Sequence, residues 1–279
     1  SKKAQALLAY LAVEADRPHS REELAGLLWP DYAEASARAN LRSVLANVRR
    51  VLDDHSAAPP FLAIAGETVQ YNSAADQQVD VAVFKRQAPA PLNVGVAVAA
   101  LETAVAQVRA PFLAGFSLPD SPPFEEWVLL KREYFDRQLA AVRQQLAEHW
   151  LAQGDFAHAQ AHAERWAALE PWQEEAHQLV MRILAQRGRR SDALKYFETC
   201  RRILNAEVGL EPGEETIALA DHIRRGVAAG RSQEIRQQAT ARHGGSHQVL
   251  SLSRLIGRDA EVTRISAILS DPQQRLVTI

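Results

Sequence analysis

Four arginines stand close together in a stretch that holds no acidic residue from position 38 to 52: Arg38, Arg42, Arg49 and Arg50. A guanidinium group can bond the edge of a guanine through two hydrogen bonds, or it can neutralise a backbone phosphate. At about 100° per residue, the apolar Leu41, Leu45 and Val48 fall on the side opposite the arginines. The spacing therefore predicts an amphipathic helix with one apolar face and one positive face.

The positive face has the properties needed to approach a DNA major groove. Its small residues Ala39, Ser43 and Ala46 would let the helix come close to the bases. We expect Arg42 and Arg50 near the middle of the face, and Arg38 and Arg49 at its edges, where phosphates lie. The candidate DNA-binding residues are Arg38, Asn40, Arg42, Ser43, Asn47, Arg49 and Arg50.

A basic helix by itself is more often a solvated amphipathic helix than a DNA reader. Residues 1–86 contain ten Lys and Arg against eleven Asp and Glu, so the positive face is local and does not follow from composition. The neighbouring elements decide between the two interpretations.

Those elements follow the order of a winged helix. Apolar spacing predicts helices over 3–15 and 33–52, and Ser20 and Glu23 form a capping-box pattern that begins a third helix at 21–28. Trp29-Pro30-Asp31 ends that short helix, because proline cannot continue the hydrogen-bond ladder. Two short β patterns flank Gly66-Glu67 and predict a hairpin over about 61–72. Three helices followed by a hairpin favour a DNA-binding interpretation.

The run KAQALLAYLAVEADRPHSREELAGLLWPDYAEASARANLRSVLANVRRVL resembles the DNA-binding domain of the SARP-type antibiotic regulatory activators, an OmpR-like winged helix. The resemblance implies double-stranded promoter DNA as partner, bound at direct repeats by tandem copies. The family fold opens with a small sheet, and no strand is expected before Lys2. The chain is thus expected to be either a fragment or a degenerate version.

The middle of the chain contains a 34-residue repeat. Gly154 and Ala159 are matched by Gly188 and Ala193, each 34 positions later, and this is the tetratricopeptide period. The small alanines would let two helices cross closely, and the glycines would permit the tight turn between them. We expect a helical-repeat domain over 95–226.

Two runs in this region, APFLAGFSLPDSPPFEEWVLLKREYFDRQL and the stretch from WQEEAHQLV to DHIRR, resemble the bacterial transcriptional activator domain of the same regulators. The resemblance implies three helical hairpins packed against the DNA-binding unit. It further implies RNA polymerase as a client, and homodimer contacts.

The expected organisation is a winged helix at 1–86, a Pro-rich break near 86–94, the repeat domain at 95–226 and a linker at 227–248. Residues 249–279 resemble the beginning of a STAND-type nucleotide-binding ATPase domain, with 274–279 as a strand. No G-x-x-x-x-G-K-[ST] phosphate loop follows. We therefore expect no cofactor in this chain, with ATP implied only for a domain further downstream.

Several residues that could suggest other chemistry have plainer interpretations. His158 and His162 stand at i, i+4, but a third ligand is missing nearby, so we expect a solvated repeat face and no metal. Three tryptophans are expected in the repeat core: Trp150, Trp166 and Trp172. Trp127 is expected to anchor the first long helix of the activation domain, and Cys200 to be buried and inert.

The composition sets the remaining limits. The chain has 279 residues, 47% of them hydrophobic, a net charge of −2 and one cysteine, which suits a mainly α protein of about two domains without disulfides. No run of 18 apolar residues and no signal peptide are apparent, so we expect a cytoplasmic protein without a membrane partner.

Three classes of function remain open, and none is an enzyme, since no catalytic motif stands out. The first is a sequence-specific DNA-binding transcriptional activator that recruits RNA polymerase through its helical repeats. The second is a helical-repeat adaptor between proteins, and the third is a regulatory fragment of a signal-transduction ATPase.

Overall fold

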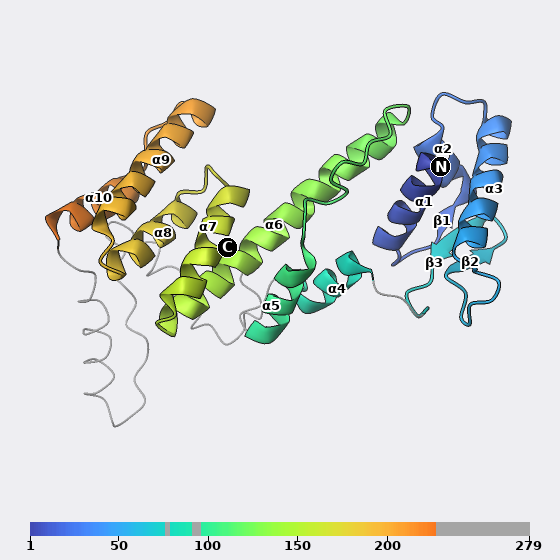
Figure 1. Cartoon of the computed structure of the whole chain (residues 1–279). Helices are drawn as coiled ribbons and strands as arrows, with labels where there is room; N and C mark the ends of the chain where they lie inside the picture. Colours follow the sequence, from blue (N-terminus) through green and yellow to red (C-terminus); the bar gives the residue numbers. More distant parts are fainter. Residues whose placement is uncertain (76–78, 91–95, 227–279) are drawn as a thin grey trace, which may run out of the picture. The chain divides into compact units, whose positions relative to one another are not determined.

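The first part of the chain forms three helices and a small antiparallel sheet (Figure 1). The computed structural model describes residues 1–75, 79–90 and 96–226, so the predicted linker and the ATPase-like tail lie outside the described residues. In chain order the elements are α1 (Lys2–Val13), β1 (His19–Ser20), α2 (Arg21–Leu28), α3 (Glu34–Val51), β2 (Leu62–Ala65) and β3 (Thr68–Tyr71).

The sheet has the order β1-β3-β2, with both pairs antiparallel. Val69 at its centre is paired with His19 on one side and Ile64 on the other, and its side chain is fully buried. The hairpin is where the sequence predicts it. The two-residue strand β1 was not predicted, since a strand this short has no alternation to detect.

The rest of the described chain is helical. Its elements are α4 (Asp80–Gln87), α5 (Val98–Gln107), α6 (Pro122–Ala152), α7 (Phe156–Leu169), α8 (Glu174–Gln186), α9 (Arg190–Val208) and α10 (Glu214–Arg225). Residues 80–86, which the sequence analysis assigned to the first segment, form most of α4. Phe84 of α4 packs with Leu101 of α5 in one buried cluster. The expected mainly α fold is confirmed for the residues that the structure describes.

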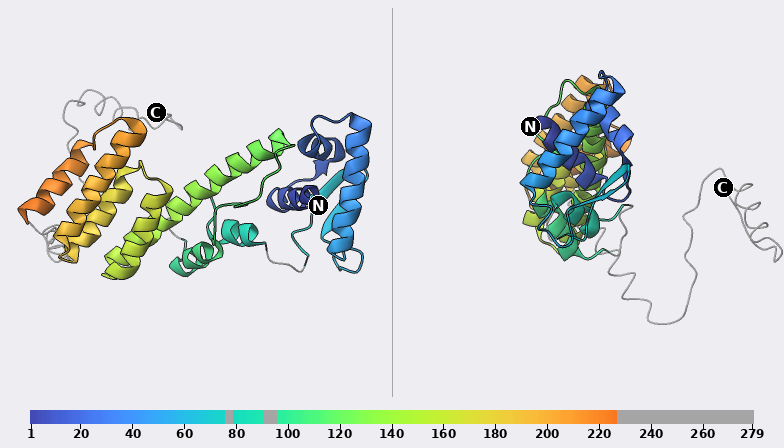
Figure 2. Two further views of the ribbon diagram at one scale, coloured as in Figure 1. Left: turned by 45° about the horizontal axis from the view of Figure 1, so that its top comes forward. Right: turned by 90° about the vertical axis from the view of Figure 1, so that its right-hand side faces the viewer.

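The 34-residue repeat corresponds to two helical hairpins, α6 with α7 and α8 with α9, and α10 packs against the second (Figure 2). Gly154 and Gly188 stand in the equivalent turns with φ of +78° and +75°, a left-handed conformation that favours glycine. Ala159 and Ala193 have no exposed surface, because neighbouring helices cross directly over them.

Of four residues in the repeat region, two lie where the sequence predicts and two do not. Trp166 is buried, but Trp172 is 59% exposed, so its expected place in the core is wrong. It stands in the turn after Pro171, outside the inner face of any helix. His162 is buried rather than solvated, and it contacts both Arg143 and Glu102. Cys200 is buried as expected, and burial raises the pKa of its thiol to about 11.

The start of α6 is inserted into the hydrophobic core of the winged helix. Phe124 and Val128 belong to the same buried cluster as Leu7, Leu24 and Leu41. The Ser121 hydroxyl at the N-cap of α6 donates to the backbone oxygen of Leu27 in α2. The winged helix and the activation helices therefore share one core.

Phe124→Ala should lower the free energy of unfolding by about 3–5 kcal/mol, because it leaves a cavity at a site with no exposed surface. Tyr134→Ala, on the same helix but 40% exposed, should change it by less than about 1 kcal/mol. Denaturant titration followed by tryptophan fluorescence measures both. Equal effects of the two substitutions would show that α6 is not inserted.

Candidate nucleic-acid interface

Helix α3 is fixed by one buried face and leaves the other open. Leu41, Leu45 and Val48 are at most 4% exposed and pack in the winged-helix core. Figures 1 and 2 show α3 on the side of α1 and α2 that faces away from α6. Its outward face is therefore free of the activation helices.

The middle of this outward face carries an exposed cation. Arg42 and Ser43 are both exposed, and within the described part of the chain neither side chain has a hydrogen-bond or ion-pair partner. The flanking Ala39 and Ala46 are exposed as well, so nothing bulky surrounds Arg42 on its own helix. This is the arrangement that a helix needs to approach a polyanion closely.

Two further candidates lie one turn along the helix and bond each other. The Arg50 guanidinium donates to the Asn47 side-chain oxygen at 2.8 Å, and Arg50 is exposed. A hydrogen bond between two solvent-facing groups on one helix is easily exchanged for another partner. Asn40 is half-buried at the margin of the same face.

Arg38, at the beginning of α3, is surrounded by carboxylates. It lies 3.2 Å from Glu34 of its own helix, 3.6 Å from Glu67 of the hairpin turn and 3.9 Å from Glu22 of α2. Residues 38–52 contain no acidic residue, but carboxylates from outside this stretch surround its first residue, Arg38. A phosphate would compete with three negative charges for Arg38.

Arg49 holds the far end of α3 to the sheet. Its Nε donates to the Asp54 carboxylate at 2.8 Å, and the amide of Leu62 in β2 donates to the other oxygen at 3.0 Å. Asp54 is fully buried; burial raises its pKa, but these bonds and the Arg49 charge outweigh burial and hold the pKa below its ordinary value. Sequence spacing places Arg49 at the edge of the face and does not reveal this structural partner.

The hairpin turn is fixed against the start of α2. The Arg21 amide donates to the backbone oxygen of Glu67 at 2.9 Å, and Arg21 Nε donates to that of Gly66 at 3.3 Å. The turn thus presents the acidic Glu67 beside Arg38, which disfavours a phosphate contact at this tip.

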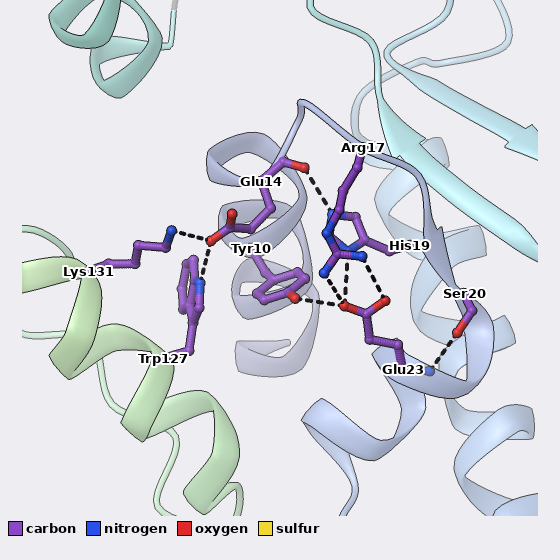
Figure 3. A network of polar contacts seen from close by, with 8 residues as sticks. All are labelled: Tyr10, Glu14, Arg17, His19, Ser20, Glu23, Trp127 and Lys131. Atoms are coloured by element: carbon purple, nitrogen blue, oxygen red, sulfur yellow. Dashed lines mark hydrogen bonds and ion pairs between the residues drawn. The ribbon is translucent and has the colours of Figure 1, made fainter. Parts of the chain in front are cut away.

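A network of polar contacts around the buried His19 supports the turn between α1 and α2 (Figure 3). The Ser20 hydroxyl accepts from the Glu23 amide at 3.0 Å, as the capping-box pattern predicts. The Glu23 carboxylate does not reach back, because it accepts from Arg17 at 2.6 Å, from Tyr10 at 3.2 Å and lies 3.3 Å from His19. The bond from Arg17 is the largest cause that lowers the pKa of Glu23 to about 2.

A second carboxylate in Figure 3 joins α1 to α6. Glu14 accepts from the Trp127 indole at 2.7 Å and lies 2.6 Å from the Lys131 ammonium. Burial raises the pKa of Glu14, but these bonds outweigh burial and lower it overall. Trp127 therefore anchors α6 by its ring in the core and by its N–H on α1.

The described residues contain neither a metal-binding cluster nor a helix that could span a membrane. No group of three or more His, Cys, Asp and Glu side chains there is arranged to hold a metal ion. His158 instead pairs with Asp155 at 2.7 Å. Among the described helices, none combines the length and the apolar character needed to cross a membrane.

Residues 79–224 match the family model of the bacterial transcriptional activator domain, which is more than half of the chain. The chain belongs to this family of transcription regulators, as the SARP resemblance implies. The match begins at the residue before α4, which agrees with the packing of α4 on α5.

Among known proteins, the chain is similar to the transcriptional regulatory protein EmbR of Mycobacterium bovis and Mycobacterium tuberculosis. It is 25% identical to each over 229 residues, which is 80% of this chain and 58% of theirs. A solved structure of Mycobacterium tuberculosis EmbR in complex with a low-affinity phosphopeptide shares the fold, with a TM-score of 0.62 and 24% identity. That match covers 85% of this chain and 66% of the other. The relatives are named as transcriptional regulatory proteins.

Arg49→Ala should lower the free energy of unfolding by about 1.5–3 kcal/mol, because the buried Asp54 carboxylate loses a charged donor. Arg50→Ala, one residue further along, removes only an exposed bond and should change it by less than about 0.5 kcal/mol. Denaturant titration of both variants tests this. An Arg49→Ala protein as stable as the parent would contradict a structural role for Arg49.

Glu23→Gln should destabilise the protein in a pH-dependent way. Because the folded pKa of about 2 lies below the ordinary 4.5, the ionised group stabilises the fold above pH 4.5, and this contribution is lost as the pH falls toward 2. The melting temperatures of parent and variant should thus differ at neutral pH, approach each other as the pH falls below 4.5, and coincide near pH 2. Glu22→Gln, on the exposed side of the same turn, serves as control, with a small difference at every pH. A constant gap for Glu23→Gln would refute the linkage.

Proposed function

We propose that the protein is a sequence-specific DNA-binding transcriptional activator that reads promoter DNA with α3. The observation that carries this proposal is Arg42, exposed in the middle of the outward face of α3 and without a partner among the described residues. Its location is the one at which winged helices meet base edges in the major groove.

The geometry supports unequal roles for the candidate residues. Arg42, Ser43, Asn47 and Arg50 are the proposed contacts to bases, since all four lie on the outward side and none holds another element in place. Asn40 stands at the margin of the outward face, and we propose that it contacts only the sugar-phosphate backbone of the DNA. Arg38 and Arg49 are weaker candidates for phosphate contact than the sequence suggests, because carboxylates already engage both.

We further propose that the helical repeats recruit RNA polymerase and that copies of the protein bind direct repeats side by side. Stacked helical hairpins provide extended surfaces for peptide or helix recognition. Large apolar side chains of α6 remain exposed and suit a protein contact: Leu129, Leu130 and Tyr134. The family and this exposed surface support the proposal of both partners, RNA polymerase and further copies of this chain. The domain boundaries near residue 79 and residue 226, and a cytoplasmic location, belong to the same proposal.

A protein-protein adaptor remains the second candidate. The observation in its favour is the set of three carboxylates around Arg38, since a negative cluster at the end of a DNA-reading face repels phosphate. DNA binding by α3 and its dependence on Arg42 separate the two candidates.

Arg42→Ala should weaken binding to a cognate promoter site by about 1–3 kcal/mol and relax the preference at one base pair, because a base-reading guanidinium is lost. A gel-shift titration on cognate and scrambled duplexes at two salt concentrations measures the change. With purified RNA polymerase, the parent should raise transcription from that promoter, and Arg42→Ala should raise it less.

Arg182→Ala, an exposed arginine on α8, is the matched control and should bind DNA like the parent. Circular dichroism should show equal helicity for all three proteins. If Arg42→Ala also binds like the parent at both salt concentrations, this face does not touch DNA and the adaptor function gains support.

A further inference from the structure

A cavity of about 790 Å³ lies between the winged helix and the activation helices. Its walls come from Leu8 of α1, Phe84 of α4, the segment that leads into α6, and Phe135 of α6. The volume is within the usual range for sites that bind small molecules. The cavity is distinct from the outward face of α3 and is not used by the proposed DNA contact.

The lining is mostly apolar and partly aromatic. The ring of Phe135 lies 5.2 Å from that of Phe112 and 6.4 Å from that of Phe84, centre to centre. Leu8 and Leu139 complete this part of the wall. Such a surface favours an apolar or aromatic ligand body over a sugar or a nucleotide phosphate.

The wall of the cavity includes the carboxylate of Asp136. Asp136 is half-buried, and among the described residues it has no hydrogen-bond or ion-pair partner. Its charged neighbour Arg132 is engaged elsewhere, donating to the backbone oxygens of Phe112 at 2.8 Å and Leu113 at 2.9 Å. Burial raises the pKa of Asp136, and Arg132 only partly opposes it. A cation placed beside this carboxylate would relieve the cost of burying it.

The other charged residues of the lining also favour a cationic ligand. Asp80, at the start of α4, adds a second carboxylate, against one exposed arginine, Arg109. The balance of charge in the cavity is therefore negative. Among the lining residues, an anionic ligand would meet two carboxylates and one guanidinium.

We propose that this cavity binds a small molecule with an aromatic body and one protonated amine, which pairs with Asp136. The ligand would contact α1 and α6 at once, and would thereby strengthen the contact between the winged helix and the activation domain. The proposal does not depend on the identity of the DNA site.

The test uses 4-phenylbutylamine as probe and 4-phenyl-1-butanol as its uncharged counterpart, with the full 279-residue chain. Saturation-transfer NMR titrations give the Kd of each. For the parent, the amine should bind at least about tenfold more tightly than the alcohol, since it adds a charge-assisted bond. Asp136→Asn should make the two Kd values equal. Ala9→Met, which narrows the cavity from α1, should weaken both probes by a similar factor.

Glu126→Gln removes an exposed carboxylate from the same helix and should leave the preference for the amine unchanged. Ala12→Met, from the same wall, replaces Ala9→Met if that variant does not fold. Equal binding of amine and alcohol to the parent would overturn the proposal. So would a preference for the amine that persists in Asp136→Asn, or methionine variants that bind both probes like the parent.

Discussion

The insertion of Phe124 into the core of the winged helix is the contact on which the rest of the structure depends. Phe124 belongs to α6, yet it has no exposed surface, because side chains of α1, α2 and α3 close around it. Ser121 and Trp127, which flank Phe124 in the sequence, add hydrogen bonds to Leu27 and Glu14. A DNA-binding unit of this size has a small core, and the aromatic residues of α6 enlarge it. Stability and the connection between the winged helix and the activation helices thus rest on the same side chains.

The four arginines of α3 show why charge on a helix face is a poor measure of binding surface. Helical spacing places all four on the polar face of α3, but each has different neighbours in the folded structure. Arg49 forms an ion pair with the buried Asp54. Arg38 lies near three glutamates, one each from α2, α3 and the hairpin turn. Arg42 alone projects without a partner among the described residues, so the proposed reading surface is narrower than the basic face.

Much of the fold follows from local patterns in the sequence. The boundaries of α2 and α3 agree with prediction within a residue, because apolar periodicity and the proline after Trp29 specify them locally. Two glycines and two alanines predict the repeat, because steric limits favour glycine in the turns and a small residue where helices pack closely. The site was less predictable. Asp54 stands only five residues after Arg49, and Arg17 six before Glu23, but each pair meets across an irregular turn that has no period to detect. Glu14 bonds a tryptophan 113 positions later, which no spacing rule connects with the end of α1. The sequence does not predict α4, because a segment of eight residues is too short to show helical periodicity clearly.

Helix α6 runs for 31 residues without a break, so at 1.5 Å per residue it is about 46 Å long. Its first turns are held in the winged-helix core, and its last turns form the first repeat with α7. Such a helix acts as a lever with its fulcrum at Phe124. A tilt of only about 5° at that end would carry the other end through about 4 Å, since displacement grows with arm length. Small changes in side-chain packing around the fulcrum would therefore be magnified into shifts large enough to make or break a contact at the repeats.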